Sequence, residues 1–494
     1  MTGMIERTEA SWAKHQTWPP TDVRTRWRDI ESYRRRYRNS KTELIQANPN
    51  IMMDNHKVSI YTPVPWPREL CRFSSALLFA SEPRVTTAED QERVESLLRI
   101  SDFEAFAIRG GVMAACEGRM GIRVLRDPII ASRPILTLVP EDRILWDIRH
   151  DTFVVGGLVV IERVEQSHDR DAPIRYRLLE EHSPGVVRRV LFKGWDHELG
   201  KRVPLTSYPE FASLAPEEST GLSAATLVPW ENIPGAESDL LGLGPIFDEL
   251  NEAESLLLDR GRKSTPRLFV DRSLLDDTGR ALIDGMIITG GSRMRAPLGA
   301  KATDEILLTD PKLQTKEHIE WLDHLTQLIV TCAGYSPLTW GIQGKTASVT
   351  RAVSGYAMKL AQLRTLLNRA GKAHMAARAL GQAIAVASAW DIQAHDVAEF
   401  VPSLALGDGL PNDALDGAQE VLYLHQAEAA STETLVRTVH PTWNDVEIQA
   451  EVDKIMDEAA VPPGQGPAVG IGPIPRRVHA VLDDADPEDS LGTP

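Results

Sequence analysis

The stretch WGIQGKTASVT at 340–350 contains the residue types and spacing closest to a site of chemistry. Gly344, Lys345 and Thr346 match the end of the phosphate-binding pattern G-x-x-x-x-G-K-[ST], in which backbone N–H groups and the lysine hold nucleotide phosphates. The pattern also needs a glycine five residues before Gly344, and Thr339 occupies that position. The match is therefore partial, and it argues against a nucleotide site.

The surroundings of this stretch argue the same way. A phosphate loop follows a strand, whereas this one follows an amphipathic helix predicted at 316–334 and then Pro337. A companion apolar run that ends in an acidic residue should supply the magnesium ligand. The best candidate, LVVIE ending at Glu162, lies far upstream, in a region that lacks the alternation of strands and helices typical of a parallel sheet. An atypical nucleotide-dependent protein that uses Lys345 stays open as an alternative.

Other chemistry has little support in the sequence. There is no G-x-S-x-G elbow, no H-x-x-x-H pair and no cluster of cysteine and histidine. We therefore predict no catalytic residue, no metal site and no cofactor. We expect the carboxylate pairs to lie at solvated turns or helix ends, and the cysteines to be buried reduced thiols. The pairs include Glu180-Glu181 and Asp276-Asp277, and the cysteines are Cys71, Cys116 and Cys332.

The composition is that of a globular protein with two or more domains. The chain has 494 residues, of which 42% are hydrophobic and 25% charged. No run approaches the ~18 apolar residues of a membrane helix, and the N-terminus does not resemble a secretory signal. The net charge of −16 argues against a protein that coats nucleic acid. Arginines nevertheless concentrate at 21–40, and acidic residues at 391–460.

Periodicity and turn residues predict an α+β fold. Short β-rich runs fill 121–230 and indicate a mostly antiparallel sheet, and a compact insert with short strands follows at 265–315. The helix at 86–102 is expected to start at a threonine cap. We predict helices at about 22–48, 67–80, 86–102, 101–117, 245–262, 316–334, 348–390, 411–429, 431–438 and 443–459.

Three stretches, within an order of elements that covers roughly 20–460, resemble the portal proteins of tailed bacteriophages of the siphophage type. They are PWENIPGAESDLLGLGPIFDELNEAESLLLD, AGYSPLTWGIQGKTASVTRAVSGYAMKLAQL and GDGLPNDALDGAQEVLYLHQAEAASTETLVR. The resemblance implies a portal fold that assembles into a ring. Its parts would be a wing at 1–240 with a helical head and an antiparallel β region, a two-helix stem at 245–262 and 316–334, a small α/β clip at 265–315, a tunnel loop at 337–348, a long wing helix at 348–390 and a helical crown at 391–460. We expect 461–494 to be a disordered tail.

The resemblance also implies a function that is not enzymatic. Portal proteins form a channel of about twelve subunits at one capsid vertex, each contacting its two neighbours through different faces. Double-stranded DNA is packaged through this channel by the terminase large subunit, and later leaves through it into the tail. Other partners would be head-completion or adaptor proteins, the major capsid protein and scaffolding proteins, but no membrane. The chain would belong to the virion, and to the host cytoplasm during assembly. A phage head scaffold or adaptor without a channel is a further alternative.

The resemblance assigns candidate residues to three places. Lys345 would present a cation to DNA phosphates without reading sequence, and stem acids would make the channel wall repulsive. Four arginines in the helical stretch 21–40 would face the capsid shell, namely Arg34, Arg35, Arg36 and Arg38. Salt bridges inside the chain are the alternative role for these arginines. The candidates are Gly341, Gln343, Gly344, Lys345 and Thr346 in the tunnel loop; Asp248, Glu252, Glu317 and Glu320 on the stem; and Arg272, Arg280, Arg293, Arg295 and Lys301 in the clip.

Overall fold

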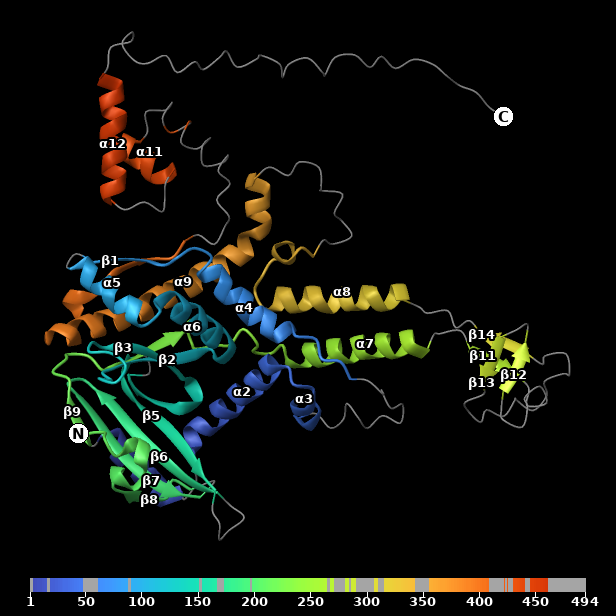
Figure 1. Ribbon diagram of the computed structural model, residues 1–494, viewed down its shortest axis with the longest axis horizontal. Helices are drawn as coiled ribbons and strands as arrows, with labels where there is room; N and C mark the ends of the chain where they lie inside the picture. The colour runs from blue at the N-terminus through green and yellow to red at the C-terminus, as the bar shows by residue number, and fades with distance from the viewer. Residues whose placement is uncertain are drawn as a thin grey trace. The chain divides into compact units, whose positions relative to one another are not determined.

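The protein has the α+β fold that its sequence predicts, with helices and antiparallel sheets (Figure 1). The chain divides into two compact units, Met1–Gly409 and Leu410–Pro494, and each is described by itself. The structure is a computed structural model. It describes residues 3–15, 18–47, 61–87, 90–150, 153–166, 173–195, 198–263, 267–270, 280–283, 286–289, 306–309, 315–342, 355–407, 422, 424, 430–439 and 445–460.

Helices dominate the chain before the first sheet. The predicted helix at 22–48 is divided in two, because Asn39 adopts a left-handed conformation with φ of 53° and ends the first part. The threonine cap expected for 86–102 was wrong. Residues 84–86 form a strand, and the helix begins after Asp90, whose side chain accepts a hydrogen bond from Arg93 N at 3.1 Å. The helices are α1 (Met4–His15), α2 (Thr21–Arg38), α3 (Lys41–Ala47), α4 (Trp66–Leu78), α5 (Gln91–Ile100) and α6 (Phe103–Glu117).

The region 119–231 contains two antiparallel sheets, as the sequence predicts. Three strands pair in the order β10-β2-β3, and six belong to a second sheet in which β4 to β8 follow one another and β9 pairs with β7. Their bounds are β2 (Arg119–Leu125), β3 (Ile135–Pro140), η2 (Glu141–Arg143), β4 (Ile144–Arg149), β5 (Phe153–Glu165), β6 (Ile174–Ser183), β7 (Val186–Gly194), β8 (Lys201–Val203), η3 (Leu205–Ser207), η4 (Pro209–Phe211), β9 (Glu217–Ser219) and β10 (Leu227–Glu231).

Two helices, α7 (Gly244–Lys263) and α8 (Thr315–Cys332), lie side by side (Figure 1). They pack through buried side chains of one cluster, with Phe247 and Leu250 on α7 and Leu325 and Ile329 on α8. Between them in sequence are two pairs of antiparallel strands, β11 with β14 and β12 with β13. The strands are β11 (Arg267–Val270), β12 (Arg280–Ile283), β13 (Met286–Thr289) and β14 (Ile306–Thr309).

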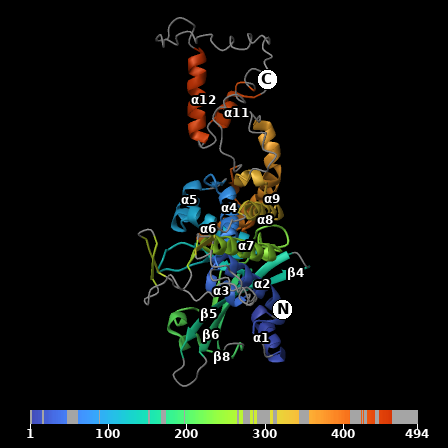
Figure 2. The ribbon, with the colours of Figure 1, turned by 90° about the vertical axis from the view of Figure 1, so that its right-hand side faces the viewer.

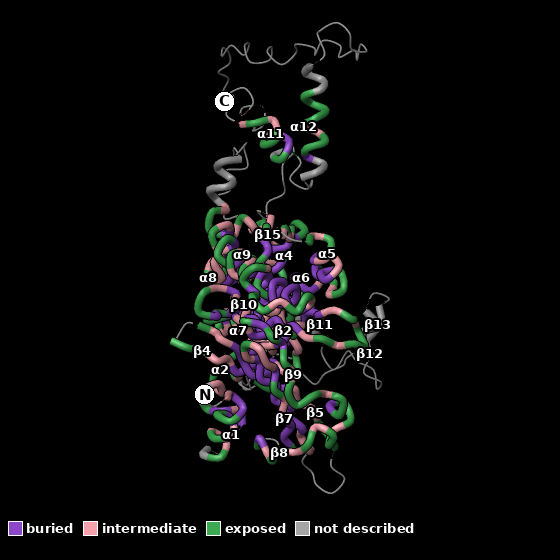
Figure 3. The backbone as a smooth tube through the Cα atoms, turned by 90° about the vertical axis from the view of Figure 1, so that its left-hand side faces the viewer, coloured by how far each residue is buried: buried purple, intermediate pink, exposed green. Residues whose placement is uncertain are grey.

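The largest buried core gathers around the second half of the long helix α9 (Gly355–Ile392). Alanines and branched residues between Ala376 and Trp390 pack there on α5, α6, β2 and β10, and the backbone is purple in this region of Figure 3. At ~1.5 Å per residue the helix spans roughly 57 Å. The turn η7 (Ala398–Phe400) follows. Strand β15 (Ser403–Ala405) then pairs with β1 (Arg84–Thr86), so residues near 404 lie beside a strand from the N-terminal half of the chain.

The second unit contains two described helices, α11 (Thr432–Val439) and α12 (Asp445–Ala460). They pack against each other, and each buries one apolar residue, Val436 and Ile448 respectively. Both match helices that the sequence predicts. The helix predicted at 411–429 and the tail at 461–494 lie outside the described residues, apart from Leu422 and Leu424.

Candidate functional site

The described part of the predicted tunnel loop is its entry, just after α8. The helix ends at Cys332, and the chain turns through Gly334, whose φ is 85°. A 3-10 turn, η6 (Pro337–Trp340), follows and ends at Gly341 with φ of 69°. Both φ values lie in the left-handed region that favours glycine. Because an α-helix and a 3-10 turn lead into the loop, it does not follow a strand as a phosphate-binding loop does.

A buried lysine holds this entry in place. Lys372 on α9 donates hydrogen bonds from Nζ to Asp239 Oδ1 at 2.6 Å, to Ser74 Oγ at 2.8 Å and to Tyr335 Oη at 3.0 Å. The Lys372 and Asp239 side chains are 3% and 5% exposed. We call Ser74, Asp239, Tyr335 and Lys372 the Lys372 cluster. It joins α4, the chain before α7, the loop entry and α9, which come together in Figures 1 and 2.

The Lys372 cluster is complete as a hydrogen-bonded unit. An ammonium has three donors, and each of those of Lys372 has a partner. Asp239 Oδ1 also accepts from Asn232 Nδ2 at 2.7 Å. Burial, followed by the charge of Asp239, raises the pKa of Tyr335 well above its ordinary value, so the phenol stays neutral. Lys372 is 3% exposed and all its donors have partners, so this arrangement holds the loop entry in place.

Two further residues of α9 hold the same segment. Thr365 Oγ1 accepts a hydrogen bond from Ser336 N at 2.9 Å and lies 2.9 Å from Thr339 Oγ1. Asn368 Nδ2 donates to Ala333 O at 3.3 Å. Thr365, Asn368 and Lys372 are three and four residues apart, which places them on one face of the helix. Sequence reasoning missed this polar stripe, although its spacing in an alanine- and leucine-rich helix is a readable signal.

Two leucines of α9, Leu363 and Leu367, lie at the surface of the chain. Leu363 is 46% exposed and Leu367 is 65% exposed, while the polar stripe beside them is turned inward. Hydrogen bonds to the loop entry account for this orientation of the helix.

Aromatic side chains also hold the loop entry in place. The Trp340 ring centroid lies 4.4 Å from that of Phe73 and 5.1 Å from that of Trp66, both on α4. Phe73 also meets Tyr335 edge to face at 5.4 Å. Such pairs contribute about 0.5–1.5 kcal/mol each beyond the area they bury. The loop entry is therefore clamped between α4 and α9.

Two cysteines lie beside the Lys372 cluster. Cys71 on α4 and Cys116 on α6 are buried, as predicted. Burial, with a hydrogen bond to Cys116, raises the pKa of the Cys71 thiol well above its ordinary value, which keeps it protonated and unreactive. The prediction for Cys332 was wrong. It is exposed, because it is the last residue of α8 and the chain turns away just beyond it.

The tunnel-loop candidates are only partly described. Gly341 is exposed at the end of η6. Gln343, Gly344, Lys345 and Thr346 lie outside the described residues, so their assignment to a DNA channel stays a prediction.

The stem candidates lie on α7 and α8 but differ in their surroundings. Glu252, Glu317 and Glu320 are exposed. Asp248 accepts hydrogen bonds from Arg36 Nη1 at 2.7 Å and Nη2 at 3.0 Å, and its side chain is 29% exposed. The guanidinium of Arg36 offsets the charge of Asp248, so this carboxylate would repel DNA less than an unpaired one.

The clip candidates are described least. Arg280 belongs to strand β12, and the structure describes only its backbone. Arg272, Arg293, Arg295 and Lys301 lie outside the described residues. Binding of terminase or adaptor proteins at these positions stays a prediction.

The arginines of α2 mostly form salt bridges inside the chain, which is the alternative to a capsid-facing surface. Arg34 binds Glu117 at 2.7 Å and also Asp142. Arg36 binds Asp248 on α7, and Arg38 pairs with Glu31 and Glu43, each at 2.9 Å. These pairs tie α2 to α6, η2, α7 and α3. The predicted capsid-facing role therefore has no support from Arg34, Arg36 or Arg38.

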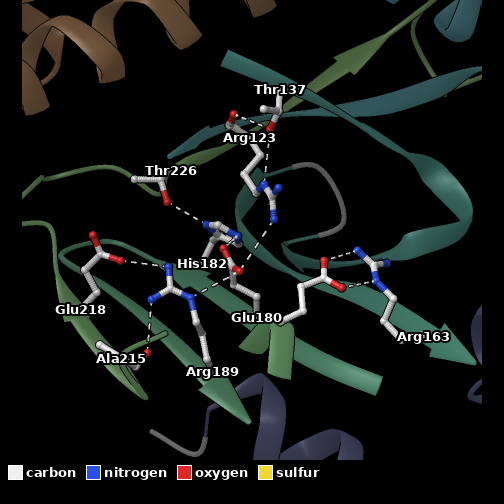
Figure 4. Close-up of polar contacts among 10 residues, drawn as sticks. Arg123, Thr137, Arg163, Glu180, His182, Arg189, Ala215, Glu218 and Thr226 are labelled. Carbon is white, nitrogen blue, oxygen red and sulfur yellow. Dashed lines mark hydrogen bonds and ion pairs between the residues drawn. The ribbon is translucent and has the colours of Figure 1, made fainter. Parts of the chain in front are cut away.

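The carboxylate pair at 180–181 corrects a sequence expectation, because both residues are buried in strand β6 and neither is at a turn. Glu180 lies 3.1 Å from His182 Nε2, 3.4 Å from Arg189 Nε and 3.7 Å from Arg123 Nη1 (Figure 4). We call Arg123, Glu180, His182 and Arg189 the Glu180 cluster. Glu181 instead accepts from Met4 N at 2.7 Å, at the start of α1. Partners on neighbouring strands and helices make burial of these charges possible.

The basic groups of the Glu180 cluster decide its ionisation. Burial by itself would raise the pKa of Glu180, but the hydrogen bond and charge of His182 and the charges of Arg123 and Arg189 outweigh burial. Together they hold this pKa well below its ordinary value. Arg189 also donates to Glu218 at 2.8 Å, and His182 Nδ1 lies 2.7 Å from Thr226 Oγ1 (Figure 4). The Glu180 cluster is therefore a second buried group of ion-paired side chains, and it lies in the β region.

Within the described residues, no group of three or more His, Cys, Asp or Glu side chains could hold a metal ion. In that same part of the chain, no helix is both long and apolar enough to span a membrane.

The chain is similar in structure to chains of known proteins. A chain from the virion of a native gene transfer agent particle is similar with a TM-score of 0.38 and 13% identity, over 76% of this chain and 90% of that chain. No protein-family model matches the sequence, and no curated protein is similar to it. A structural likeness this weak carries no conclusion about function.

Proposed function

We propose that this chain is the subunit of a portal ring, the head-tail connector of a tailed bacteriophage. About twelve copies would form a channel at one capsid vertex. Double-stranded DNA would enter through it under the action of a separate terminase and leave through it into the tail. The chain itself would bind and guide DNA and would not hydrolyse nucleotide.

The observation that carries this proposal is the way in which the entry of the predicted tunnel loop at 337–348 is held. The loop follows α8 and precedes α9, and its entry is fixed to α9 by Lys372, Thr365 and Asn368. Aromatic packing of Trp340 fixes it to α4 as well. A short loop that carries a lysine and has a rigid entry can press a cation against a passing polymer without moving the surrounding core. This is the mechanical requirement of a channel loop.

The chemistry of the loop suits a contact that slides. Lys345 would meet phosphates, which are alike at every base pair, so the contact carries no sequence information. Each such contact is electrostatic and weakens with salt, so it can break and re-form as DNA advances. Exposed Glu252, Glu317 and Glu320 on α7 and α8 would add repulsion along the stem. The three sequence stretches that resemble portal proteins include most of the first stem helix and this loop.

The nucleotide alternative gains nothing from the structure. Thr339 stands where a phosphate loop has its first glycine, and it is part of a 3-10 turn bonded to α9. A phosphate-binding loop needs free backbone N–H groups at the end of a strand.

The first test is electron microscopy of the purified full-length chain. The proposal expects rings of about twelve subunits with an axial pore that admits duplex DNA. A monomer or dimer at high protein concentration, or an oligomer without an axial pore, would contradict it. The last outcome would favour a scaffold or adaptor.

The second test addresses Lys345 in particles. We expect Lys345→Glu to reduce the rate or length of DNA packaging, Lys345→Ala to have a smaller effect and Lys345→Arg to remain near wild type. Isolated rings should bind no ATP, with or without Lys345. Normal packaging and ejection by both the Ala and Glu variants would remove the DNA contact from the proposal, and binding of ATP that Lys345→Ala abolishes would favour the nucleotide alternative.

A further inference from the structure

Helices α4 and α6 pack closely against each other. A Cβ atom added at Gly111 of α6 would lie 2.6 Å from Ser75 Oγ and 2.9 Å from the Phe79 ring, both on α4, so a neighbour would have to shift to admit it. Ser75 Oγ also donates a hydrogen bond to Ile108 O at 2.8 Å. Small residues at a helix contact let the two backbones approach closely. The contact between α4 and α6 is therefore a close one.

About one helical turn further along, the same contact brings two thiols together. Cys71 lies four residues before Ser75 on α4, and Cys116 lies five residues after Gly111 on α6. The two thiols are hydrogen-bonded to each other. Cys71 is 0% exposed and Cys116 is 4% exposed, so neither meets solvent. In the folded chain each thiol therefore has a reaction partner that is already in place.

The chemistry that suits such a pair is oxidation to a disulfide. A disulfide joins Cβ atoms about 3.8 Å apart, so it forms only between segments that pack closely. The contact at Gly111 and the thiol contact at Cys71 both meet this condition. A metal ion fits less well, because within the described residues no group of three or more His, Cys, Asp or Glu side chains could hold one.

Burial decides which oxidant can reach the pair. Burial raises the pKa of the Cys71 thiol and keeps it protonated, so it does not react with bulky reagents in solution. Hydrogen peroxide is little larger than water and oxidises thiols by two electrons. One thiol sulfur takes an oxygen from peroxide, so an S–O bond forms, the O–O bond breaks and water is released. The second thiol then attacks this sulfur, so the S–S bond forms, the S–O bond breaks and a second water leaves.

We propose that Cys71 and Cys116 are a redox pair, which peroxide converts to a disulfide between α4 and α6. Phe73 and Ser74, which hold the loop entry from the α4 side, are within three residues of Cys71. The disulfide therefore adds a covalent tie next to this part of α4. It also closes a loop of about 45 residues in the unfolded chain, which disfavours unfolding. This inference does not depend on the proposed ring function.

Mass spectrometry of the full-length chain tests the pair. Cys332→Ser first removes the exposed thiol, which would otherwise react with the same reagents. The protein is treated with hydrogen peroxide, freed of peroxide with catalase, unfolded in N-ethylmaleimide and weighed. The untreated chain should take up a maleimide on each of its two thiols. The peroxide-treated chain should take up none and should be about 2 Da lighter than the dithiol chain, because two hydrogens are lost.

The variants Cys71→Ser and Cys116→Ser, each made in the Cys332→Ser chain, are the matched controls. Serine is close to cysteine in size, so the helix contact is expected to survive. The remaining thiol has no partner, so peroxide should add oxygen to it or leave it free, with no loss of two hydrogens. In the chain that has both thiols, oxygen added to one thiol while the other takes up maleimide would overturn the pairing.

A second measurement does not need peroxide to reach the folded core. The Cys332→Ser chain is unfolded and refolded in a mixture of oxidised and reduced glutathione, so the thiols can exchange before they are buried. The disulfide should form, and its denaturant midpoint should be higher than that of the same chain reduced with dithiothreitol. Trypsin cleavage after Lys345 should also be slower. A refolded chain with two free or glutathione-bound thiols, or a disulfide form with a lower midpoint, would overturn the inference.

Discussion

The Lys372 cluster and the Glu180 cluster both bury charge, but they do so in different ways. The Lys372 cluster has one cation and one carboxylate, completed by a hydroxyl and a phenol, from four segments up to 298 residues apart. The Glu180 cluster has one carboxylate surrounded by three basic groups, from its own strand β6, from the neighbouring strand β7 and from β2 of the other sheet. The first fixes a loop entry between helices, and the second fixes sheets to each other.

Because of this difference, both clusters should affect the stability of the chain, but only one should affect the loop. Loss of either cluster should destabilise the chain, because each leaves charge buried without its partner. Of the two clusters, only the Lys372 cluster contacts the entry of the predicted tunnel loop, through Tyr335. A measurement that follows the loop should therefore respond to one cluster and not to the other. Trypsin provides it, because it cleaves after Lys345.

The largest effect is expected for Lys372→Met. Methionine keeps the chain length but leaves the Asp239 carboxylate buried without a cation, so the free energy of unfolding should fall by about 3–5 kcal/mol. Denaturant unfolding followed by tryptophan fluorescence measures this loss. Cleavage after Lys345 in the native protein should become faster. Lys454→Met is the control, since Lys454 is 69% exposed and its pairing with Glu451 is worth less than about 1 kcal/mol.

Glu180→Gln should have the next largest effect. Glutamine keeps the shape but removes the charge that Arg123, Arg189 and His182 share, and a loss of about 2–3 kcal/mol is expected from charged hydrogen bonds of this kind. Cleavage after Lys345 should not change. Glu210→Gln, at a half-exposed carboxylate that pairs with Arg163, is the matched control. Faster cleavage after Lys345 in Glu180→Gln would show that the two clusters are coupled, and the comparison would fail.

A double variant sharpens the interpretation of the Lys372 cluster. Lys372→Met combined with Asp239→Asn leaves no unpaired charge, so it should be at least about 1 kcal/mol more stable than Lys372→Met alone. The asparagine oxygen can still accept from Asn232, and its amide group can donate to Tyr335 Oη. If the two losses simply add, the cost of Lys372→Met comes from packing and not from the stranded carboxylate.

The pH dependence of stability should distinguish the Glu180 cluster. The folded pKa of Glu180 lies below its ordinary value of 4.5. Its contribution is therefore complete above that pH and is lost as the pH falls below it toward the folded pKa. The stability difference between wild type and Glu180→Gln should be constant from pH 6 to pH 8 and shrink below about pH 4.5. A difference that stays the same at pH 3 would contradict this account.

The smallest effect is expected for Thr365→Val. Valine has the same shape but cannot accept the hydrogen bond from Ser336 N, so about 1 kcal/mol of stability should be lost. Cleavage after Lys345 should increase despite this small loss. Glu180→Gln costs more stability. If the cleavage rate nevertheless increases more in Thr365→Val, the hydrogen bond from Ser336 N to Thr365 holds the loop directly. Equal or slower cleavage in Thr365→Val would contradict the role of this bond.

Local patterns in the sequence predicted most elements of the fold. The helix expected at 245–262 is α7, Gly244–Lys263, and the helix expected at 316–334 is α8, Thr315–Cys332. Periodic apolar residues and capping signals lie within a few residues of the elements they specify. The errors occurred where a local signal was ambiguous. Asn39 divided a helix that looked continuous, and Asp90 replaced the expected threonine cap.

The polar core could not be predicted in the same way. Glu180 and Glu181 were expected in solvent, because two adjacent carboxylates are usually solvated and their partners on other elements cannot be seen in the sequence. Lys372 looked like one more polar residue of a long helix. Its partners Ser74 and Asp239 are 298 and 133 residues away.

The sequence by itself determined the α+β character of this protein, the antiparallel β region and the helices α7, α8 and α9. Only the tertiary structure decided which charges are buried, which face of α9 turns inward and how the loop entry is held. The physical reason is that periodicity and capping act over a few residues. An ion pair or a hydrogen bond instead depends on which distant segments the fold brings within about 3 Å.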